Sequence, residues 1–300
     1  QAFSSIEYIM RDVDYGWMIR YMHTTGASLF FAVVYLHMFR GLLYGSYQKP
    51  KELVWIFGCT IYLAMMAEGF LGYVLPYGQM SYWGAQVIIS LFGAIPYIGE
   101  SLELWVRGDY YISGITVSRF FALHVVALPL VLIALVFLHL VALHEVGAGN
   151  PEGVDIEEHL DEDGVPLDSV PFFPYKVLNA LVAIGVFMTV FSIIMFFFPE
   201  GGGYFIEMAN FQEANPLVTP DHIAPVWYYA PFYTMLRAIP DPLGGLIVMA
   251  AAVAIFFIVP WLDRSKVASI RYKGIYSKIA ITMFGVSFLT LGYLGTVGVT

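Results

Sequence analysis

Four histidines lie inside two long apolar stretches of this 300-residue chain, two in each stretch. His23 and His37 belong to the first stretch, and His124 and His139 belong to the second. Polar groups are costly in a hydrocarbon environment, so those found there usually have a function. Imidazole is a common ligand of haem iron. We therefore expect four metal ligands rather than four unrelated side chains bonded to backbone carbonyls.

The spacing of the histidines predicts two sites at two heights. His23 and His37 are 14 residues apart, which on a helix places both rings on one face, roughly 21 Å apart along the axis. His124 and His139 are 15 residues apart, roughly 22 Å and about 60° out of register. Pro129 lies between them and can kink the helix, and a π-bulge could absorb the odd residue. Two such helices could clamp two cofactors, one near each membrane face.

The composition is that of an integral membrane protein. Hydrophobic residues make up 59% of the chain and charged residues 12%, whereas a soluble domain has about a quarter charged residues. The mean hydropathy is +0.72. A basic patch of the kind that binds nucleic acid is absent, so the expected surroundings are lipid and not nucleic acid. The single cysteine, Cys59, excludes an intrachain disulfide and a cysteine-ligated iron–sulfur cluster within this chain.

The apolar stretches predict an all-α integral membrane protein, a multi-span helical bundle. The predicted spans, each near the ~20 residues needed to cross a bilayer, cover residues 18–44, 53–73, 120–143, 177–198, 243–262 and 275–294. Residues 83–98 and 223–239 are apolar but interrupted by Gly or Pro, and we expect each to form an interfacial or re-entrant helix.

The distribution of lysine and arginine orients the bundle. Most of the 14 basic residues flank the loops after the first, third and fifth spans, which the positive-inside rule places in the cytoplasm. The first and third spans then run in the same direction. This topology pairs His23 with His124 near the outer face, and His37 with His139 near the inner face.

Two arginines and two glycines accompany the histidines. Arg20 and Arg40 each lie three residues from a histidine of the first span, on the same side of the helix. We expect them to pair with anionic haem propionates, although snorkelling to lipid headgroups is an alternative. Gly58 and Gly72, again 14 residues apart, would let a flat macrocycle approach the second span. Ordinary small-residue helix packing is the alternative for the glycines.

Several motifs resemble cytochrome b of the cytochrome bc1 complex, and the match runs nearly the whole length of the chain. They are RYMH at 20–23, GLLYGSY at 41–47, GYVLPYGQMS at 72–81, RFFALH at 119–124 and PVWY at 225–228. That family holds two b haems in a bundle of eight spans, and the six spans here would correspond to its second through seventh. Residues 1–176 would form the haem-binding part, and residues 177–300 the C-terminal part with the outer quinol loop.

The resemblance also implies roles for particular residues. His23 and His124 would hold a low-potential outer haem, and His37 and His139 a high-potential inner haem, which are the pairs that topology predicts. His144 matches an inner-site histidine that contacts quinone. Residues expected at the outer quinol pocket are Phe70, Tyr73, Trp83, Gly84, Ile88, Pro225, Trp227, Tyr228 and Tyr233, and Arg119 is expected to contact a cofactor. For Tyr73 and Trp83 an aromatic belt at the membrane interface is the alternative.

The chain departs from the family pattern at three places. The His124–His139 spacing is one residue longer than is usual for the bc1 type and resembles the plastid relative, although the unbroken chain through the last three spans favours the bc1 type. The family's usual Pro-Glu-Trp-Tyr has Val226 in place of the glutamate that is often proposed to accept a quinol proton. The Lys-Asp pair expected after Tyr175 is replaced by a stretch with Lys176 and Asn179.

Glu68 is the only acid in the interior of the second span. Because an ionisable residue inside a span is by default a functional candidate, we expect it to accept the quinol proton that Val226 cannot take. The alternative is an interfacial carboxylate paired with one of three arginines, Arg107, Arg119 or Arg237.

The resemblance implies the catalytic cytochrome b subunit of a respiratory quinol:cytochrome c oxidoreductase in a bacterial inner membrane. Ubiquinol would be oxidised at the outer face, and electrons would pass through two b haems to quinone at the inner face, contributing to a proton gradient. The implied partners are a Rieske iron–sulfur protein, cytochrome c1 and a second copy of the complex. Two other classes remain as alternatives: a haem-b membrane anchor of a dehydrogenase, and a redox-inactive proton-coupled transporter with a histidine relay.

Overall fold

The computed structural model describes residues 2–155, 158–167 and 169–297, and these consist of helices and loops with two isolated β-bridges. Six helical stretches in this described part are long and apolar enough to cross a membrane. They are Gly16–Tyr44 (α2), Glu52–Val74 (α3), Gly114–Val146 (α6, η1 and α7), Phe172–Phe197 (η3 and α8), Pro242–Leu262 (α10) and Ile275–Thr296 (α11). The structure thus confirms the predicted all-α fold and its six spans.

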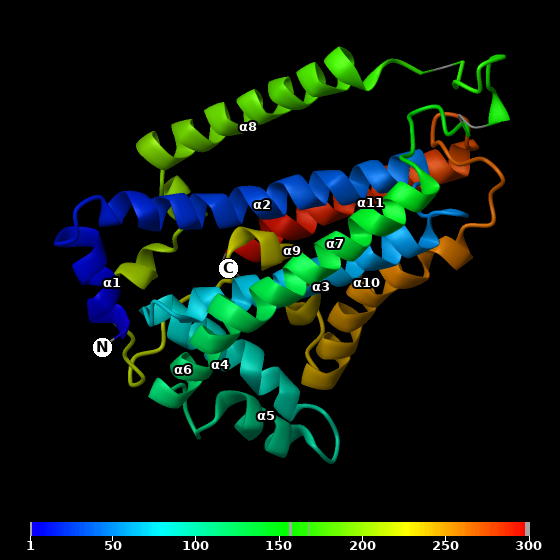
Figure 1. The fold of residues 1–300 in the computed structure, drawn as a ribbon. Helices are drawn as coiled ribbons and strands as arrows, with labels where there is room; N and C mark the ends of the chain where they lie inside the picture. Colours follow the sequence, from blue (N-terminus) through cyan, green and yellow to red (C-terminus); the bar gives the residue numbers. More distant parts are fainter. Residues whose placement is uncertain (1, 156–157, 168, 298–300) are drawn as a thin grey trace.

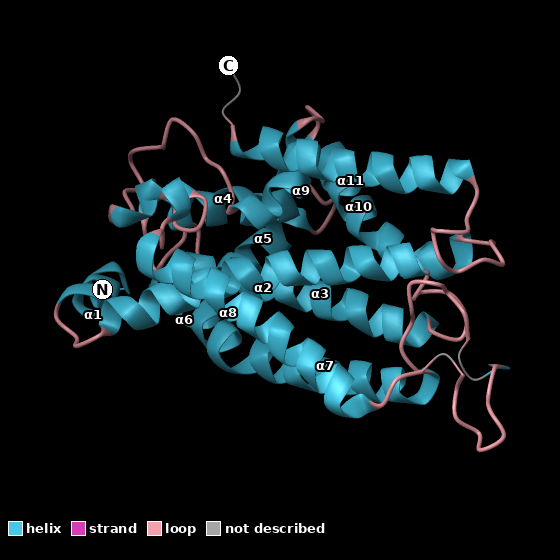
Figure 2. Ribbon diagram, turned by 90° about the horizontal axis from the view of Figure 1, so that it is seen from above, coloured by secondary structure: helices cyan, strands magenta, loops and turns pink. Residues whose placement is uncertain are grey.

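The spans run side by side, with most loops at their two ends (Figures 1 and 2). Helix α3 packs against α7, and α8 contacts α2, on the side away from α3 and α10 (Figure 1). Large apolar side chains are exposed along α7 and α8, among them Phe137 and Val182. Such a surface is stable next to lipid tails, which is what a membrane-spanning bundle requires.

The third span contains the predicted π-bulge. It is built from α6 (Gly114–Ala122), a π-helical turn η1 (Leu123–Ala127) and α7 (Leu128–Val146). Pro129 has no N–H to donate one turn back, and the backbone N–H of Leu128 instead bonds the Leu123 carbonyl, five residues earlier. The wider turn takes up one extra residue. This is how a spacing of 15 on this helix can match a spacing of 14 on α2.

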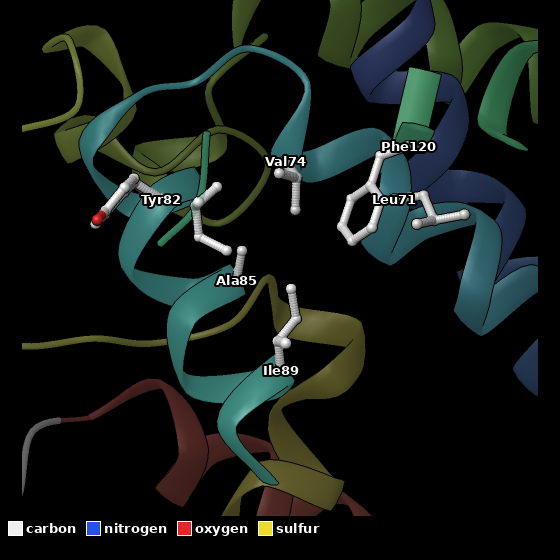
Figure 3. Packing of buried hydrophobic residues seen from close by; sticks show 7 residues of the cluster. Leu71, Val74, Tyr82, Ala85, Ile89 and Phe120 are labelled. Atoms are coloured by element: carbon white, nitrogen blue, oxygen red, sulfur yellow. The ribbon is translucent and has the colours of Figure 1, made fainter. Parts of the chain in front are cut away.

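Short helices cap one end of the bundle, called here the His23 end. They are α4 (Gln79–Gly93), α5 (Gly99–Arg107), η6 (Trp227–Tyr229) and α9 (Ala230–Arg237). Residues 83–98 and 223–239 thus contain short helices as expected. A separate helix α5 was not predicted. Figure 3 shows the apolar side chains that join α3, α4 and the start of the third span; the cluster comprises Leu71, Val74, Tyr82, Ala85, Ile89, Ile112 and Phe120.

Hydrogen bonds fix the long loop between α8 and α9 onto this end. Asn210 accepts from the backbone N–H of Ser81 at 2.7 Å, and its amide donates to the Ser81 hydroxyl at 3.0 Å. The Ser81 hydroxyl in turn donates to the Tyr73 carbonyl at 2.5 Å. Gln79 contributes two more bonds to the same loop, to the Val218 carbonyl and from the Asn215 N–H. These contacts hold the loop in place although it has no long helix of its own.

A buried ion pair ties two loops together at the opposite end, called the His37 end. Asp263 follows α10, and Lys273 precedes α11; their side chains form a salt bridge. Tyr47, in the loop after α2, donates its hydroxyl to the same carboxylate at 2.6 Å, and Gln48 donates to it at 2.9 Å. Three loop segments are therefore joined at a single carboxylate.

Candidate functional site

The four histidines meet as the two predicted pairs. The ring centres of His23 and His124 are 6.0 Å apart, and those of His37 and His139 are 6.3 Å apart. A metal–imidazole bond of about 2 Å on each side puts two ring centres about 6 Å apart. The spacing in each pair therefore suits two imidazoles that would hold one iron between them. The π-turn makes this possible at both heights, because it returns the second pair to register.

Two glycines of α3 lie against the histidines of the third span. A Cβ atom on Gly72 would come within 2.9 Å of both ring nitrogens of His124, and one on Gly58 within 3.4 Å of His139 Cε1. The matched glycine spacing therefore makes room for the histidine rings themselves. The sequence predicts that these glycines make room for a macrocycle. The atoms nearest to them belong instead to His124 and His139, the candidate metal ligands.

Each histidine pair opens into a cavity that also contains an arginine. At the His23 end a cavity of about 80 Å³ is lined by Arg20 together with His23, Gly72 and His124. At the His37 end a cavity of about 200 Å³ is lined by both histidines of the pair and by two basic residues and a glycine, namely His37, His139, Arg40, Lys51 and Gly58. The arginines fit the carboxylates of two haem groups, one at each end. Both sites therefore fit a b haem.

Arg119 does not belong to either cavity wall. Its guanidinium donates to the backbone carbonyl of Trp105 at 3.0 Å. The prediction that Arg119 contacts a cofactor has no support in this geometry, because its side chain is directed toward α5.

Glu68 lies on the side of α3 that faces His124. Its side-chain oxygen Oε1 is 3.0 Å from His124 Nδ1, and its backbone carbonyl oxygen is 2.9 Å from the same nitrogen. The other carboxylate oxygen is buried without a hydrogen-bond partner among the described residues. Metal-bound histidines commonly donate their second N–H to a carboxylate or a carbonyl, and Glu68 offers both.

Among the described residues, neither an arginine partner nor a place in the wall of the apolar cavity described next is found for Glu68, and its role in proton transfer stays a prediction. The expected arginine partners are engaged elsewhere: Arg107 pairs with Glu103, Arg119 bonds Trp105, and Arg237 donates to the Leu294 carbonyl at 3.2 Å. The carboxylate also does not line that cavity, because it is directed toward His124 in η1.

An apolar cavity of about 320 Å³ lies beside the His23 end, between α3, α4, α9 and the loop before η6. Its size is within the range of small-molecule sites, and its wall is almost entirely apolar. Six of the predicted quinol-pocket residues line it: Phe70, Tyr73, Gly84, Ile88, Pro225 and Tyr233. No heavy atom lies within 4 Å of the position a Cβ on Gly84 would take, so this glycine keeps part of the wall open.

Two family models match this chain. The one described as "Cytochrome b/b6/petB" covers residues 1–147, and the one described as "Cytochrome b(C-terminal)/b6/petD" covers residues 213–300. A cytochrome b of Allochromatium vinosum is 58% identical over 98% of this chain and 73% of the relative. The chain belongs to the cytochrome b family. Membership implies haem b binding and a part in electron transfer.

Further comparisons agree with this family. A cytochrome b of Rickettsia bellii is 50% identical over 98% of this chain and 70% of its own length. A solved structure titled "Hyperthermophilic respiratory Complex III" is 36% identical, with a TM-score of 0.91 over 99% of this chain and 76% of that chain. The structural likeness thus covers nearly the whole of this chain.

Three predicted pocket residues lie outside the apolar cavity of this cytochrome b. Trp83 donates its indole N–H to a loop carbonyl at 3.3 Å. Trp227 donates to the Ser28 hydroxyl at 3.3 Å, and Tyr228 stacks on Phe31 with ring centres 3.9 Å apart. Tyr228 lines the cavity of the His23 pair instead. The turn at η6 sends these aromatic side chains toward α2, whereas Pro225 faces the apolar cavity.

His144 and Glu207 complete the set of candidate groups. His144 is exposed on the last turn of α7, near the His37 pair but not in its cavity wall. Glu207 was missed in the sequence, because it lies in an aperiodic loop far from any motif. It lines a separate cavity of about 270 Å³ that borders the apolar one.

Proposed function

We propose that this chain is the catalytic cytochrome b subunit of a quinol:cytochrome c oxidoreductase, oxidising quinol at the His23 end and reducing quinone at the His37 end. The observation that carries the proposal is an apolar, quinone-sized cavity beside the first of two stacked histidine pairs. The membership in the cytochrome b family and the likeness to a respiratory complex III structure support it.

The histidine pairs would hold the iron of the bound groups, and the arginines would hold their carboxylates. When bound, two b haems would supply one-electron transfer across the membrane. His23 and His124 would hold one haem near Arg20, and His37 and His139 would hold the other near Arg40. We infer from the separation along α2, roughly 21 Å, that the two sites lie in opposite halves of a bilayer.

The apolar cavity binds the quinol ring and excludes water from it. Phe70 and Ile88 supply apolar walls, and Tyr73 also lines the cavity, with a buried hydroxyl that has no hydrogen-bond partner among the described residues. Tyr233 donates its hydroxyl to the Ile223 carbonyl at 2.7 Å, which keeps the loop before Pro225 closed over the cavity. A ring that releases protons and electrons is thus held close to the first histidine pair.

The partners and location follow from the same proposal. A Rieske iron–sulfur protein takes one electron of each quinol and passes it to cytochrome c1, and two copies of the complex form a dimer. The substrate is ubiquinol, the inner-site quinone contacts His144, and the membrane is the bacterial inner membrane. Proton release at the outer face and uptake at the inner face contribute to a proton gradient.

A redox titration of membranes that contain the whole complex tests the proposal. Two b-type components with different midpoint potentials are expected, and both should be reduced on addition of quinol. His159→Ala is a matched control, because His159 is exposed in the loop after α7 and lies in neither histidine cavity. Membranes without a b-type absorbance band would indicate a transporter, and haems that quinol does not reduce would indicate a membrane anchor.

A further inference from the structure

A second cavity adjoins the apolar quinol cavity on its outer side. Its volume is about 270 Å³, and it shares a wall with the quinol cavity formed by Tyr73, Ala224, Pro225 and Val226. Unlike the quinol cavity, it has polar groups in its wall, including the carboxylate of Glu207 and the side chain of Tyr204. Only the shared wall therefore separates a bound quinol from a carboxylate.

Two buried polar atoms near Glu207 lack partners. The Tyr73 hydroxyl, in the shared wall, has no hydrogen-bond partner in the described ranges, and neither does His222 Nε2 in the loop before Pro225. A buried polar group without a partner costs about 1–3 kcal/mol, so it calls for an explanation such as a ligand or a bound water. Glu207 interacts electrostatically with both residues, Tyr73 and His222, so it is close enough to each of them to take part in one proton relay.

We propose that Glu207 accepts, by way of the Tyr73 hydroxyl, the proton that quinol releases at the His23 end, and passes it toward His222 and the outer solution. The proposal rests on the proposed function, since it needs quinol in the apolar cavity. It gives Tyr73 direct contact with the substrate and makes Glu207 the carboxylate that Val226 does not provide.

The transfer is a relay of protons and involves no change of oxidation state in the protein. The quinol O–H bond breaks and its proton forms a new O–H bond with Tyr73, while the proton already on Tyr73 moves to the Glu207 carboxylate. The electrons leave separately, one to the outer b haem and one to the iron–sulfur acceptor of the proposed reaction. The proton of the second quinol hydroxyl leaves with the electron that goes to the iron–sulfur acceptor, so the product is neutral quinone. Glu207 then loses its proton to His222 or to water in the second cavity.

The surroundings of Glu207 suit a proton acceptor. The titratable groups that face it are Tyr73 from α3, Tyr204 after η4 and His222 from the loop before η6. Burial raises the pKa of the Glu207 carboxyl, and nearby His222 opposes the rise. A carboxyl group with a raised pKa exchanges protons more efficiently near neutral pH than an ordinary surface carboxylate.

The position of Glu207 is also fixed. It immediately precedes the short helix η5 (Met208–Phe211), in which Asn210 bonds Ser81 at 2.7 and 3.0 Å. Ser81 bonds the Tyr73 carbonyl, so the acceptor and the relay hydroxyl are held by one chain of hydrogen bonds. This limits the movement of Glu207 relative to the shared wall.

The test is the initial rate at which quinol reduces haem b in membranes that contain the whole complex, measured as a function of pH. Glu207→Gln should slow reduction by on the order of 100-fold near neutral pH, with both haem spectra intact. In the wild type the rate should fall as the pH drops through the raised pKa, because a protonated carboxyl cannot accept. That acid limb should be missing in the variant. Glu213→Gln, an exposed carboxylate in the same loop, is the matched control and should behave as wild type.

A second variant separates a proton acceptor from a structural carboxylate. Val226 lines both cavities, so Val226→Glu in the Glu207→Gln chain places a carboxylate between them and should restore the rate at least tenfold. A wild-type rate and pH profile in Glu207→Gln would overturn the proposal, and so would a slow variant that Val226→Glu does not rescue. Wild-type membranes in which quinol reduces neither haem would instead overturn the proposed function.

Discussion

The side-chain carboxylate of Glu68 lies 3.0 Å from Nδ1 of His124, the histidine that pairs with His23 across 6.0 Å. The backbone carbonyl of Glu68 lies 2.9 Å from the same nitrogen, so both acceptors come from one residue of α3. A carboxylate that accepts the second N–H of a metal-bound histidine fixes the ring and makes it a more electron-rich ligand. No carboxylate contacts a histidine of the second pair among the described residues, where the backbone of Val54 is the neighbour of His139.

Glu68→Gln should therefore raise the midpoint potential of the haem at the His23 pair. A neutral amide stabilises the oxidised iron less than a carboxylate does. A tenfold change in the equilibrium constant between oxidised and reduced iron corresponds to about 60 mV for one electron. We expect a rise of tens of millivolts, with the haem at the His37 pair unchanged. A redox titration of both b components checks this, with Glu52→Gln at the other end of α3 as control. Equal shifts of both haems would contradict the assignment.

His37→Leu should remove one haem and keep the other. Each pair forms its own site, with separate cavities and separate glycines, so loss of one ligand leaves the distant pair intact. Visible spectra of reduced membranes should lose a single b component, the one with the higher midpoint potential. Retention of both components, or loss of both from a complex that still assembles, would contradict the pairing.

The two α3 glycines should differ in sensitivity. A Cβ on Gly72 would come within 2.9 Å of the His124 ring nitrogens, a separation that real side chains do not tolerate, whereas a Cβ on Gly58 would come within 3.4 Å of His139. Gly72→Ala should displace His124 and lower haem occupancy at the His23 pair, and Gly58→Ala should have a smaller effect at the His37 pair.

Haem content per protein and the spectral components measure this difference. Gly185→Ala in α8, where an added Cβ meets no heavy atom within 4 Å, is the control and should retain both haems. Equal haem loss in Gly72→Ala and Gly58→Ala would indicate a general defect in helix packing instead.

The histidine pairs could be predicted from the sequence. Helical periodicity sets the height of each histidine, and the lysine–arginine distribution sets the direction of each span, so no knowledge of side-chain packing is needed. The π-turn followed from the odd spacing together with Pro129. The contact between Glu68 and His124 could not be predicted, since it depends on the rotation of α3 against η1. Trp227 and Tyr228 face away from the apolar cavity because of a tight turn with no helical period. Glu207 is placed by bonds between residues far apart in sequence, such as Asn210 with Ser81.

The ion pair between Asp263 and Lys273 should stabilise the His37 end in a pH-dependent way. Burial alone would raise the pKa of Asp263, but hydrogen bonds from Lys273, Tyr47 and the Ser265 N–H lower it to about 2. An unfolded aspartate has a pKa of about 3.9. Since the folded pKa is the lower one, the stabilisation is complete well above pH ~4 and is lost as the pH falls toward ~2. Allowing for partial exposure of the carboxylate, we expect a contribution of about 1–2 kcal/mol.

Asp263→Asn should lower the thermal unfolding temperature of the detergent-solubilised complex by several degrees near neutral pH. The loss comes from the missing pair and from the charge of Lys273, which remains buried without its partner. The difference from wild type should shrink as the pH is lowered through about 4 to 2, because the wild-type carboxyl is then protonated as well. Lys266→Met, in the same loop but outside this cluster, is the control. A difference that stays constant over that pH range would show that Asp263 acts through packing and not through its charge.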